Sequence, residues 1–289
     1  MQPLPPPLAA LAPRALGVAT EAACSGEHAR AAYLILDHYV LLARGAVVVP
    51  ALGEALAAAL PRGGGGGEGR RGALAALGVL ETCLRVAPDA APHALDSALL
   101  AVAGTLADAA DGGRGRNELV DAACACALAR LCVHRADALP ALMAAAGAGG
   151  GADPDGAVRA LGRVLDGWLE SVDSVLLLRQ RVLCAAALLR LLAETAPARA
   201  RAAEILAFAT GVVLEQDARG GPAGGAPSTF GAQLDRVAPD PVGALSTREL
   251  LRECVCALRA AGGEVALQAV DGAILEQVAR ALQQPTVGQ

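Results

Sequence analysis

The chain has 289 residues, 54% of them hydrophobic, 18% charged and 2% aromatic, and its formal net charge is −5. This much apolar surface excludes a strongly charged disordered chain, and the scarcity of aromatic residues, Ile and Thr disfavours a β-sandwich or barrel. The acidic balance argues against a general nucleic-acid-binding protein, which normally has a basic domain, so no nucleic acid is expected among its partners.

Apolar residues recur every three or four positions along most of the chain, a spacing that predicts one amphipathic helix after another. Nearly all of them are Ala, Leu or Val, and Ala and Leu lead the helix-propensity ranking. Residues 1–26 form a Pro- and Ala-rich start with a first partial helix. The helices expected next are rich in Ala and cover residues 27–43, 46–60, 72–86, 92–109 and 117–135.

The most regular pattern lies in the second half of the chain. One helix is expected where the apolar spacing is three or four throughout, at Leu161, Val164, Leu165, Trp168, Leu169 and Val172. The same period predicts helices within residues 182–192, 205–213, 250–258 and 267–282.

Helix boundaries are marked by proline, by capping residues and by Gly-rich breaks. Asn117 is expected to cap the helix that follows it, and Ser246 with Glu249 forms a capping-box pattern. Prolines, which lack the N–H that a first turn leaves unbonded, stand near three expected helix starts, at Pro92, Pro140 and Pro197. Breaks are expected at residues 61–72, 111–115, 145–156 and 220–240.

The helix pairs recur about every 40 residues, the length of HEAT and armadillo units. One such pair cannot bury its apolar face alone, so successive pairs are expected to stack. The predicted fold class is therefore all-α, an α-solenoid of HEAT/armadillo-like helical repeats over residues 27–216. A flexible Gly- and Pro-rich loop is expected at residues 217–245, a C-terminal helical pair at 246–284 and a tail at 285–289.

Cysteine usage and hydropathy indicate the compartment. Cys124, Cys126, Cys254 and Cys256 lie within helical apolar runs, so buried, reduced thiols are expected. The Pro-rich start lacks the basic region of a signal peptide, and the longest uncharged stretch, 138–152, is too short to cross a bilayer. We expect an intracellular protein without membrane insertion.

No motif predicts catalysis. Lysine is absent, which excludes a P-loop lysine, a Schiff-base lysine and a Ser-x-x-Lys pair. Residues 67–72 satisfy G-x-G-x-x-G, but an Ala-rich helix and a run of glycines precede them instead of a strand, so an inter-helix loop is expected. Cys124 and Cys126 point to opposite sides of one helix and cannot bind one metal ion. We expect no catalytic residue, no cofactor and no metal, and hence no enzyme.

One acidic stripe is the candidate partner-binding feature. Asp166, Glu170 and Asp173 are spaced at i, i+4 and i+7, which places them on one helix face. The spacing favours a solvated outer face with Arg159 and Arg163 nearby, and the alternative is a site for a basic cargo segment. Trp168, which is the only Trp of the chain, falls on the apolar stripe of this helix and is expected to be a packing anchor between repeats.

Three stretches resemble the C-terminal part of the importin-β (karyopherin-β) superfamily, closest to its importin-seven and importin-eight branch. Residues 118–132 resemble a helix of the family that begins with a Glu-Leu pair, and residues 240–242 with the helix from Thr247 resemble its final repeat. The most specific stretch, 168–192, aligns without a gap and matches the family at Trp168, Leu169, Val172, Asp173, Leu176, Leu178, Arg181, Cys184, Leu188 and Leu191.

The resemblance implies the C-terminal cargo-binding region of a nuclear transport receptor that imports proteins under control of the GTPase Ran. The partners it implies are protein cargo, including basic segments, together with Ran and nuclear pore proteins, and the implied localisation is cytoplasm and nucleus. The family's Ran-binding surface lies mainly in N-terminal repeats that this resemblance does not cover. The family's long loop is densely acidic, whereas residues 215–240 here hold four acidic residues: Glu215, Asp217, Asp235 and Asp240.

The helical period taken alone fits a generic HEAT-repeat scaffold or adaptor equally well. An all-α enzyme is disfavoured, because no convergent set of His, Asp, Glu or Cys side chains is evident in the sequence.

Overall fold

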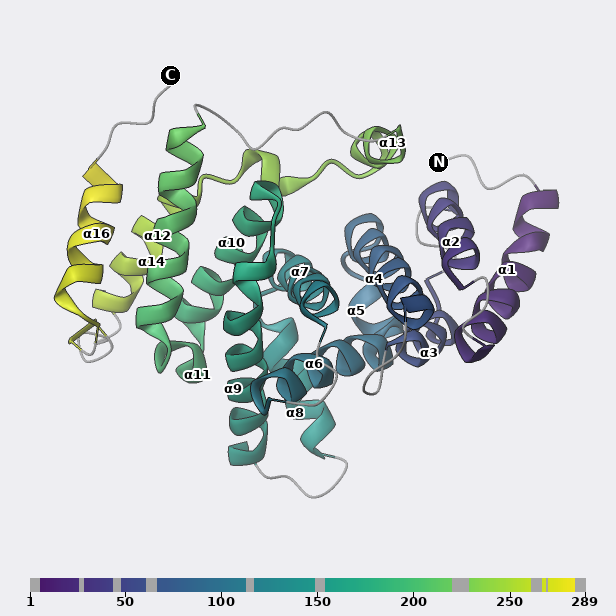
Figure 1. Ribbon diagram of the computed structural model, residues 1–289, viewed down its shortest axis with the longest axis horizontal. Helices are drawn as coiled ribbons and strands as arrows, with labels where there is room; N and C mark the ends of the chain where they lie inside the picture. Colours follow the sequence, from purple (N-terminus) through teal and green to yellow (C-terminus); the bar gives the residue numbers. More distant parts are fainter. Residues whose placement is uncertain are drawn as a thin grey trace.

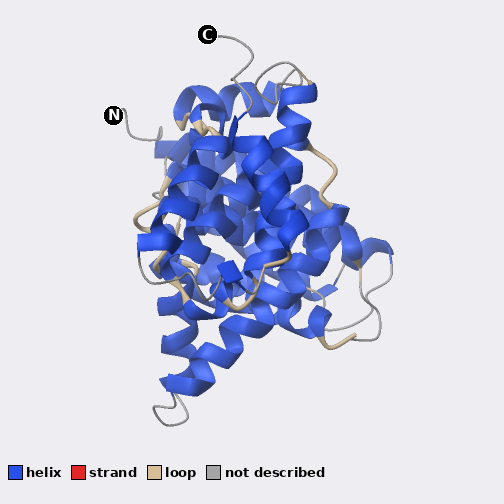
Figure 2. Ribbon diagram, turned by 90° about the vertical axis from the view of Figure 1, so that its left-hand side faces the viewer, coloured by secondary structure: helices blue, strands red, loops and turns tan. Residues whose placement is uncertain are grey.

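A computed structural model shows a chain of helices that pack in two rows (Figure 1). Among the described residues there is no strand, as Figure 2 shows, so the predicted all-α solenoid is confirmed. The structure describes residues 6–25, 29–43, 48–60, 67–112, 117–148, 154–219, 229–260, 267–268 and 270–283. The predicted tail at 285–289 lies outside them.

The two rows arise because most of the long helices pack on the next long helix of the same row as well as on a helix of the other row. Row A consists of α1 (Pro6–Ser25), α3 (Pro50–Ala59), α6 (Asp96–Ala110), α9 (Pro154–Ser171) and α12 (Ala202–Ala218). Row B consists of α2 (Ala29–Ala43), α4 (Gly67–Val86), α7 (Glu118–His134), α10 (Leu178–Glu194) and α14 (Thr247–Ala260).

Short elements connect the rows and close the C-terminal end. They are α5 (Ala91–Ala94), α8 (Ala138–Ala148), α11 (Ala196–Arg199), α13 (Thr229–Val237), α16 (Gly272–Gln283) and the 3₁₀ helices η1 (Val172–Ser174) and η2 (Pro241–Ala244). Helix α16 packs mainly on α12, and α11 lies between α9 and α12.

The helix boundaries follow the capping chemistry. The Asn117 side chain accepts a hydrogen bond from the Val120 amide at 3.3 Å, and the Ser246 hydroxyl accepts one from the Glu249 amide at 3.2 Å. Both predicted caps are confirmed. The expected break at 61–72 is wrong in its second half, because α4 begins at Gly67 and residues 67–72 are its first turns.

The core is one continuous cluster of Ala, Leu and Val side chains that runs through both rows. Small residues let the helix axes approach closely. At Gly167 of α9 the backbone of α6 is so near that an added Cβ would lie 1.7 Å from the Leu106 carbonyl oxygen. A glycine is therefore required at this contact between successive helix pairs.

The cysteine prediction is confirmed at three of its four positions. Cys124, Cys126 and Cys254 are buried, and burial raises the pKa of the Cys254 thiol to about 12. Cys256 is exposed, which corrects the prediction. Residues two apart lie on nearly opposite faces of a helix, so the face of α14 that buries Cys254 leaves Cys256 on the solvent side.

The predicted flexible loop at 217–245 is wrong for the residues that the structure describes. Helix α12 continues to Ala218, and residues 229–244 contain α13 and η2. We call residues 229–244 the crossing segment, because they lie over row B, away from α12 and α14, which flank them in the sequence (Figure 1). Residues 220–228 lie outside the described residues.

The crossing segment contacts four successive helices of row B. The Phe230 ring lies 4.9 Å from the ring of His38 of α2, measured between centroids. Asp235 pairs with Arg85 of α4, and Asp240 pairs with Arg130 of α7. Arg179 of α10 pairs with both carboxylates. Long-range ion pairs thus hold the crossing segment against row B, although its composition is typical of a loop.

The contact at Gly167 gives the first prediction. We expect Gly167→Ala to destabilise the fold by about 1–3 kcal/mol, because the methyl group would overlap the α6 backbone. Gly104→Ala on α6, where a Cβ meets nothing within 4 Å, is the matched control and should leave stability unchanged or raise it by up to about 1 kcal/mol. Urea unfolding followed by circular dichroism measures both, and equal midpoints for the two variants would contradict the prediction.

The second prediction concerns pH. Burial by itself would raise the pKa of Asp240, but the hydrogen bonds and charge of Arg130, with the Val242 amide, lower it to about 2. A carboxylate with a lowered pKa stabilises the folded state above its unfolded pKa, near 3.9, and this contribution is lost as pH falls from about 4 to about 2. We expect the melting temperature of Asp240→Asn to fall less over this range than that of the wild type.

The control for the pH prediction is Asp108→Asn, which removes an exposed carboxylate of α6. This variant should keep the wild-type slope of melting temperature against pH. A wild-type slope in Asp240→Asn as well would show that the crossing segment does not stabilise the fold through this carboxylate.

Candidate partner-binding pocket

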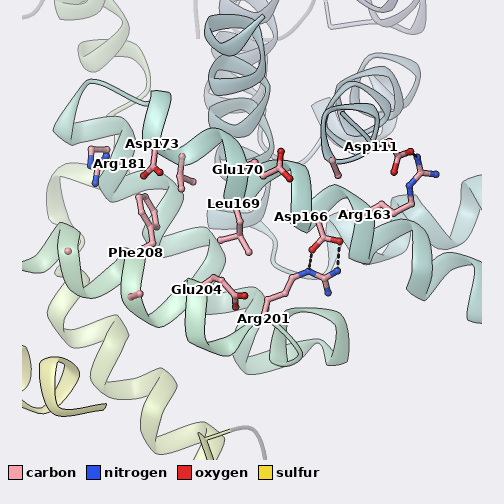
Figure 3. A pocket seen from close by; sticks show the side chains of 14 residues that line it. Asp111, Arg163, Asp166, Leu169, Glu170, Asp173, Arg181, Arg201, Glu204 and Phe208 are labelled. Atoms are coloured by element: carbon pink, nitrogen blue, oxygen red, sulfur yellow. Dashed lines mark hydrogen bonds and ion pairs between the residues drawn. The ribbon is translucent and has the colours of Figure 1, made fainter. Parts of the chain in front are cut away.

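A pocket forms where row A is interrupted. Helix α9 packs on α6 and on the short α11, whereas α12 packs mainly on α10 and α16. The space left between α9 and α12 has a volume of about 730 Å³ and is bounded by the end of α6, by α9 and η1, and by α10 and α12 (Figure 3).

All three residues of the predicted acidic stripe line this pocket. Asp166 and Glu170 come from α9, and Asp173 comes from η1, directly after the helix ends. Their spacing brings them to one wall, as Figure 3 shows. The pocket has two further carboxylates, Asp111 and Glu204, that the stripe did not include.

Two of the carboxylates are held by arginines. The Arg201 guanidinium donates two hydrogen bonds to Asp166, one from Nη2 to Oδ2 at 2.6 Å and a second from Nε to Oδ1. Arg163, expected near the stripe, pairs instead with Asp111 of α6. The Asp166 side chain stays 44% exposed, so its charge is only partly screened by protein.

Two other carboxylates face the pocket without a cation. Within the part of the chain that the structure describes, Asp173 and Glu204 make no ion pair or hydrogen bond, and both are exposed. They come from opposite walls, η1 and the first turn of α12. Two uncompensated negative charges therefore face the same space from two sides.

Leu169 and Phe208, together with Val172, Ala110 and Ala207, supply the apolar surface of the pocket. The Arg181 guanidinium carbon lies 5.3 Å from the centroid of the Phe208 ring, so the ring already contacts one cation. The Nε atom of Arg181 lies 3.1 Å from Glu215 Oε2, and this pair leaves Asp173 to solvent. Such a surface suits a side chain with an apolar stem and a positive end, which means Arg or Lys.

Five charged or aromatic residues of the pocket were not predicted from the sequence: Asp111, Arg181, Arg201, Glu204 and Phe208. Glu204 and Phe208 are four residues apart, so their shared face on α12 follows from the sequence. Nothing in the sequence shows that this face looks toward α9.

Trp168 does not line the pocket. It lies on the buried face of α9 and is 0% exposed, and its indole N–H is buried without a hydrogen-bond partner among the described residues. The structure thus places Trp168 within the core.

Neither a metal site nor a membrane span is present in the described part of the chain. It contains no group of three or more His, Cys, Asp or Glu side chains placed to hold a metal ion. None of its helices combines the length and hydropathy that a bilayer crossing requires.

A family model described as importin-11-like, TPR repeats, covers residues 1–283. No curated protein and no solved structure matches the chain. The match supports the superfamily resemblance found in the sequence, whereas the finer assignment to the importin-seven and importin-eight branch stays a prediction.

Proposed function

Because the chain belongs to the importin-11-like family of TPR repeats, we propose that it is the cargo-binding region of a nuclear transport receptor. The family is one of helical-repeat proteins of the nuclear transport receptor type. The bound cargo element in this proposal is a basic segment, and its docking place is the pocket between α9 and α12. The observation that carries the proposal is the pair of uncompensated carboxylates, Asp173 and Glu204, on opposite walls of that pocket.

The charge balance of the pocket supports a basic ligand. Among the described residues, five carboxylates and three guanidinium groups line it. Two of the guanidinium groups, those of Arg163 and Arg201, bind Asp111 and Asp166. An arriving Arg side chain would therefore meet Asp173 and Glu204 first and could stack on Phe208, which adds a cation–π contact.

Exposed charges at such a rim act mainly on the association rate. The chain as a whole is acidic, with a net charge of −5, so long-range attraction of a basic segment adds to the local contacts. Binding of this kind weakens as salt is raised, because exposed charges are screened.

Family membership extends the proposal to the partners of transport. Ran and nuclear pore proteins would be the other partners, and the protein would move between cytoplasm and nucleus without catalysing a reaction. In a solenoid each repeat contacts its neighbours, so ligands that favour different curvatures compete through the shape of the whole stack.

The proposal predicts that Asp173→Asn with Glu204→Gln weakens binding of a fluorescently labelled Arg/Lys-rich peptide roughly tenfold. The two lost exposed charge pairs are each worth ~0.2–1 kcal/mol, so together they are worth ~0.4–2 kcal/mol, a range that includes a tenfold change. Fluorescence anisotropy at low and at physiological salt measures the affinity. Glu54→Gln with Glu253→Gln, which removes exposed carboxylates of α3 and α14 that do not line the pocket, is the matched control.

Equal affinity of the pocket variant and the control variant would overturn the assignment of the pocket. A separate measurement distinguishes a receptor from a generic helical-repeat scaffold. The full gene product should release the basic peptide when GTP-loaded Ran is added, and retention of the peptide would favour the scaffold.

A further inference from the structure

An arginine cluster lies beneath the crossing segment, on the opposite row from the pocket. Its members are Arg85 of α4, Arg130 of α7 and Arg179 of α10, one from each of three successive row B helices. Residues two apart on a helix point in nearly opposite directions, which is why Arg179 meets this cluster while Arg181 lines the pocket.

Two carboxylates of the crossing segment form ion pairs with the arginines of the cluster. Arg130 Nη1 donates to Asp240 Oδ1 at 2.6 Å, and Arg179 Nη2 lies 2.7 Å from Asp240 Oδ2. Arg179 Nη2 also donates to Asp235 Oδ1 at 3.2 Å, and Arg85 binds the same oxygen. The Arg130 and Asp240 side chains are only 4% and 3% exposed, so this is a desolvated ion pair.

Row B itself supplies little negative charge at this place. The carboxylate that it adds to the cluster is Glu81 of α4, whose Oε1 accepts from Arg130 Nη2 at 3.0 Å. The Nε atoms of Arg85 and Arg130 are buried without a partner among the described residues. Without the crossing segment, three guanidinium groups would face one carboxylate on an otherwise acidic chain.

Few apolar contacts hold the crossing segment. Leu234 and Val242 are its buried apolar side chains, and of the two only Val242 joins the main core. Helix α13 contacts α2 through Phe230 and α4 through Asp235. Desolvated ion pairs are costly to form and contribute specificity more than net stability. A second chain that carries the same carboxylates could therefore replace the segment at a small net cost.

We propose that the arginine cluster is a binding site for an acidic segment of a partner protein, and that the crossing segment is its built-in competitor. The partner segment has two carboxylates about five residues apart, like Asp235 and Asp240, with an apolar residue beside each, like Leu234 and Val242. The tethered segment has a high local concentration, so it lowers the apparent affinity for the partner. This inference does not depend on the proposed function, because it uses other residues on another face.

The probe is a fluorescently labelled peptide that copies residues 229–244. We expect it to bind Asp235→Asn/Asp240→Asn, whose own crossing segment has lost its charges, at least tenfold more tightly than it binds the wild type. A peptide with both aspartates changed to Asn should bind neither protein. Adding Arg179→Gln to the double variant should weaken binding again, since Arg179 contacts both carboxylates and is partly exposed.

Glu253→Gln, which neutralises an exposed carboxylate of α14, is the control and should bind the peptide as weakly as the wild type. A double variant that melts like the wild type and gains no affinity would show that the crossing segment is a fixed part of the fold, and would overturn the proposal.

Hydrogen–deuterium exchange on the wild type decides the question if the double variant does not fold. Excess charged peptide should speed exchange in residues 230–244, because it displaces the tethered segment. Unchanged exchange at saturating peptide would overturn the proposal independently.

Discussion

Close approach of helix backbones is the constraint on which this structure depends. An Ala-rich helix has little side-chain area, so its apolar face is buried only if the neighbouring axis comes very near. The contact between Gly167 of α9 and the Leu106 carbonyl of α6 shows how near it comes. Every helix pair is stabilised mainly by its neighbours, so the order of helices in the two rows follows directly from chain order. Most core contacts therefore join residues of the same repeat or of adjacent repeats.

The two places with partner chemistry lie where this regular packing is broken. Row A opens between α9 and α12, since α11 intervenes there, and acidic side chains line the opening. Row B keeps its stacking, but three of its helices each present an arginine to one patch. The chain thus has an acidic pocket on one row and a basic cluster on the other, and the basic cluster is occupied by the chain's own aspartates. Opposite charges on opposite rows allow two partners of opposite charge to bind without competing for the same residues.

Local features were predictable from the sequence, and long-range placement was not. The 3.6-residue period predicted the helices, Asn117 and Ser246 predicted their caps, and the spacing of Asp166, Glu170 and Asp173 predicted one shared wall. The crossing segment was missed because its Gly- and Pro-rich surroundings are typical of a loop. Its position depends on pairs such as Asp240 with Arg130, which lie 110 residues apart. Likewise, the partner of Asp166 is Arg201, on another element, and helical spacing carries no information about that pairing.

The crossing segment also changes how such a stack should fold and unfold. Repeat proteins ordinarily lose structure from either end, because interactions reach only from one repeat to the next. Here residues 229–244 join the α2, α4, α7 and α10 helices through contacts that span most of the chain. Contacts between residues far apart in the sequence slow folding. A segment that contacts four repeats at once also makes the unfolding of one repeat depend on the others. While the segment is bound to row B, these four repeats should therefore unfold more cooperatively than a row of independent units.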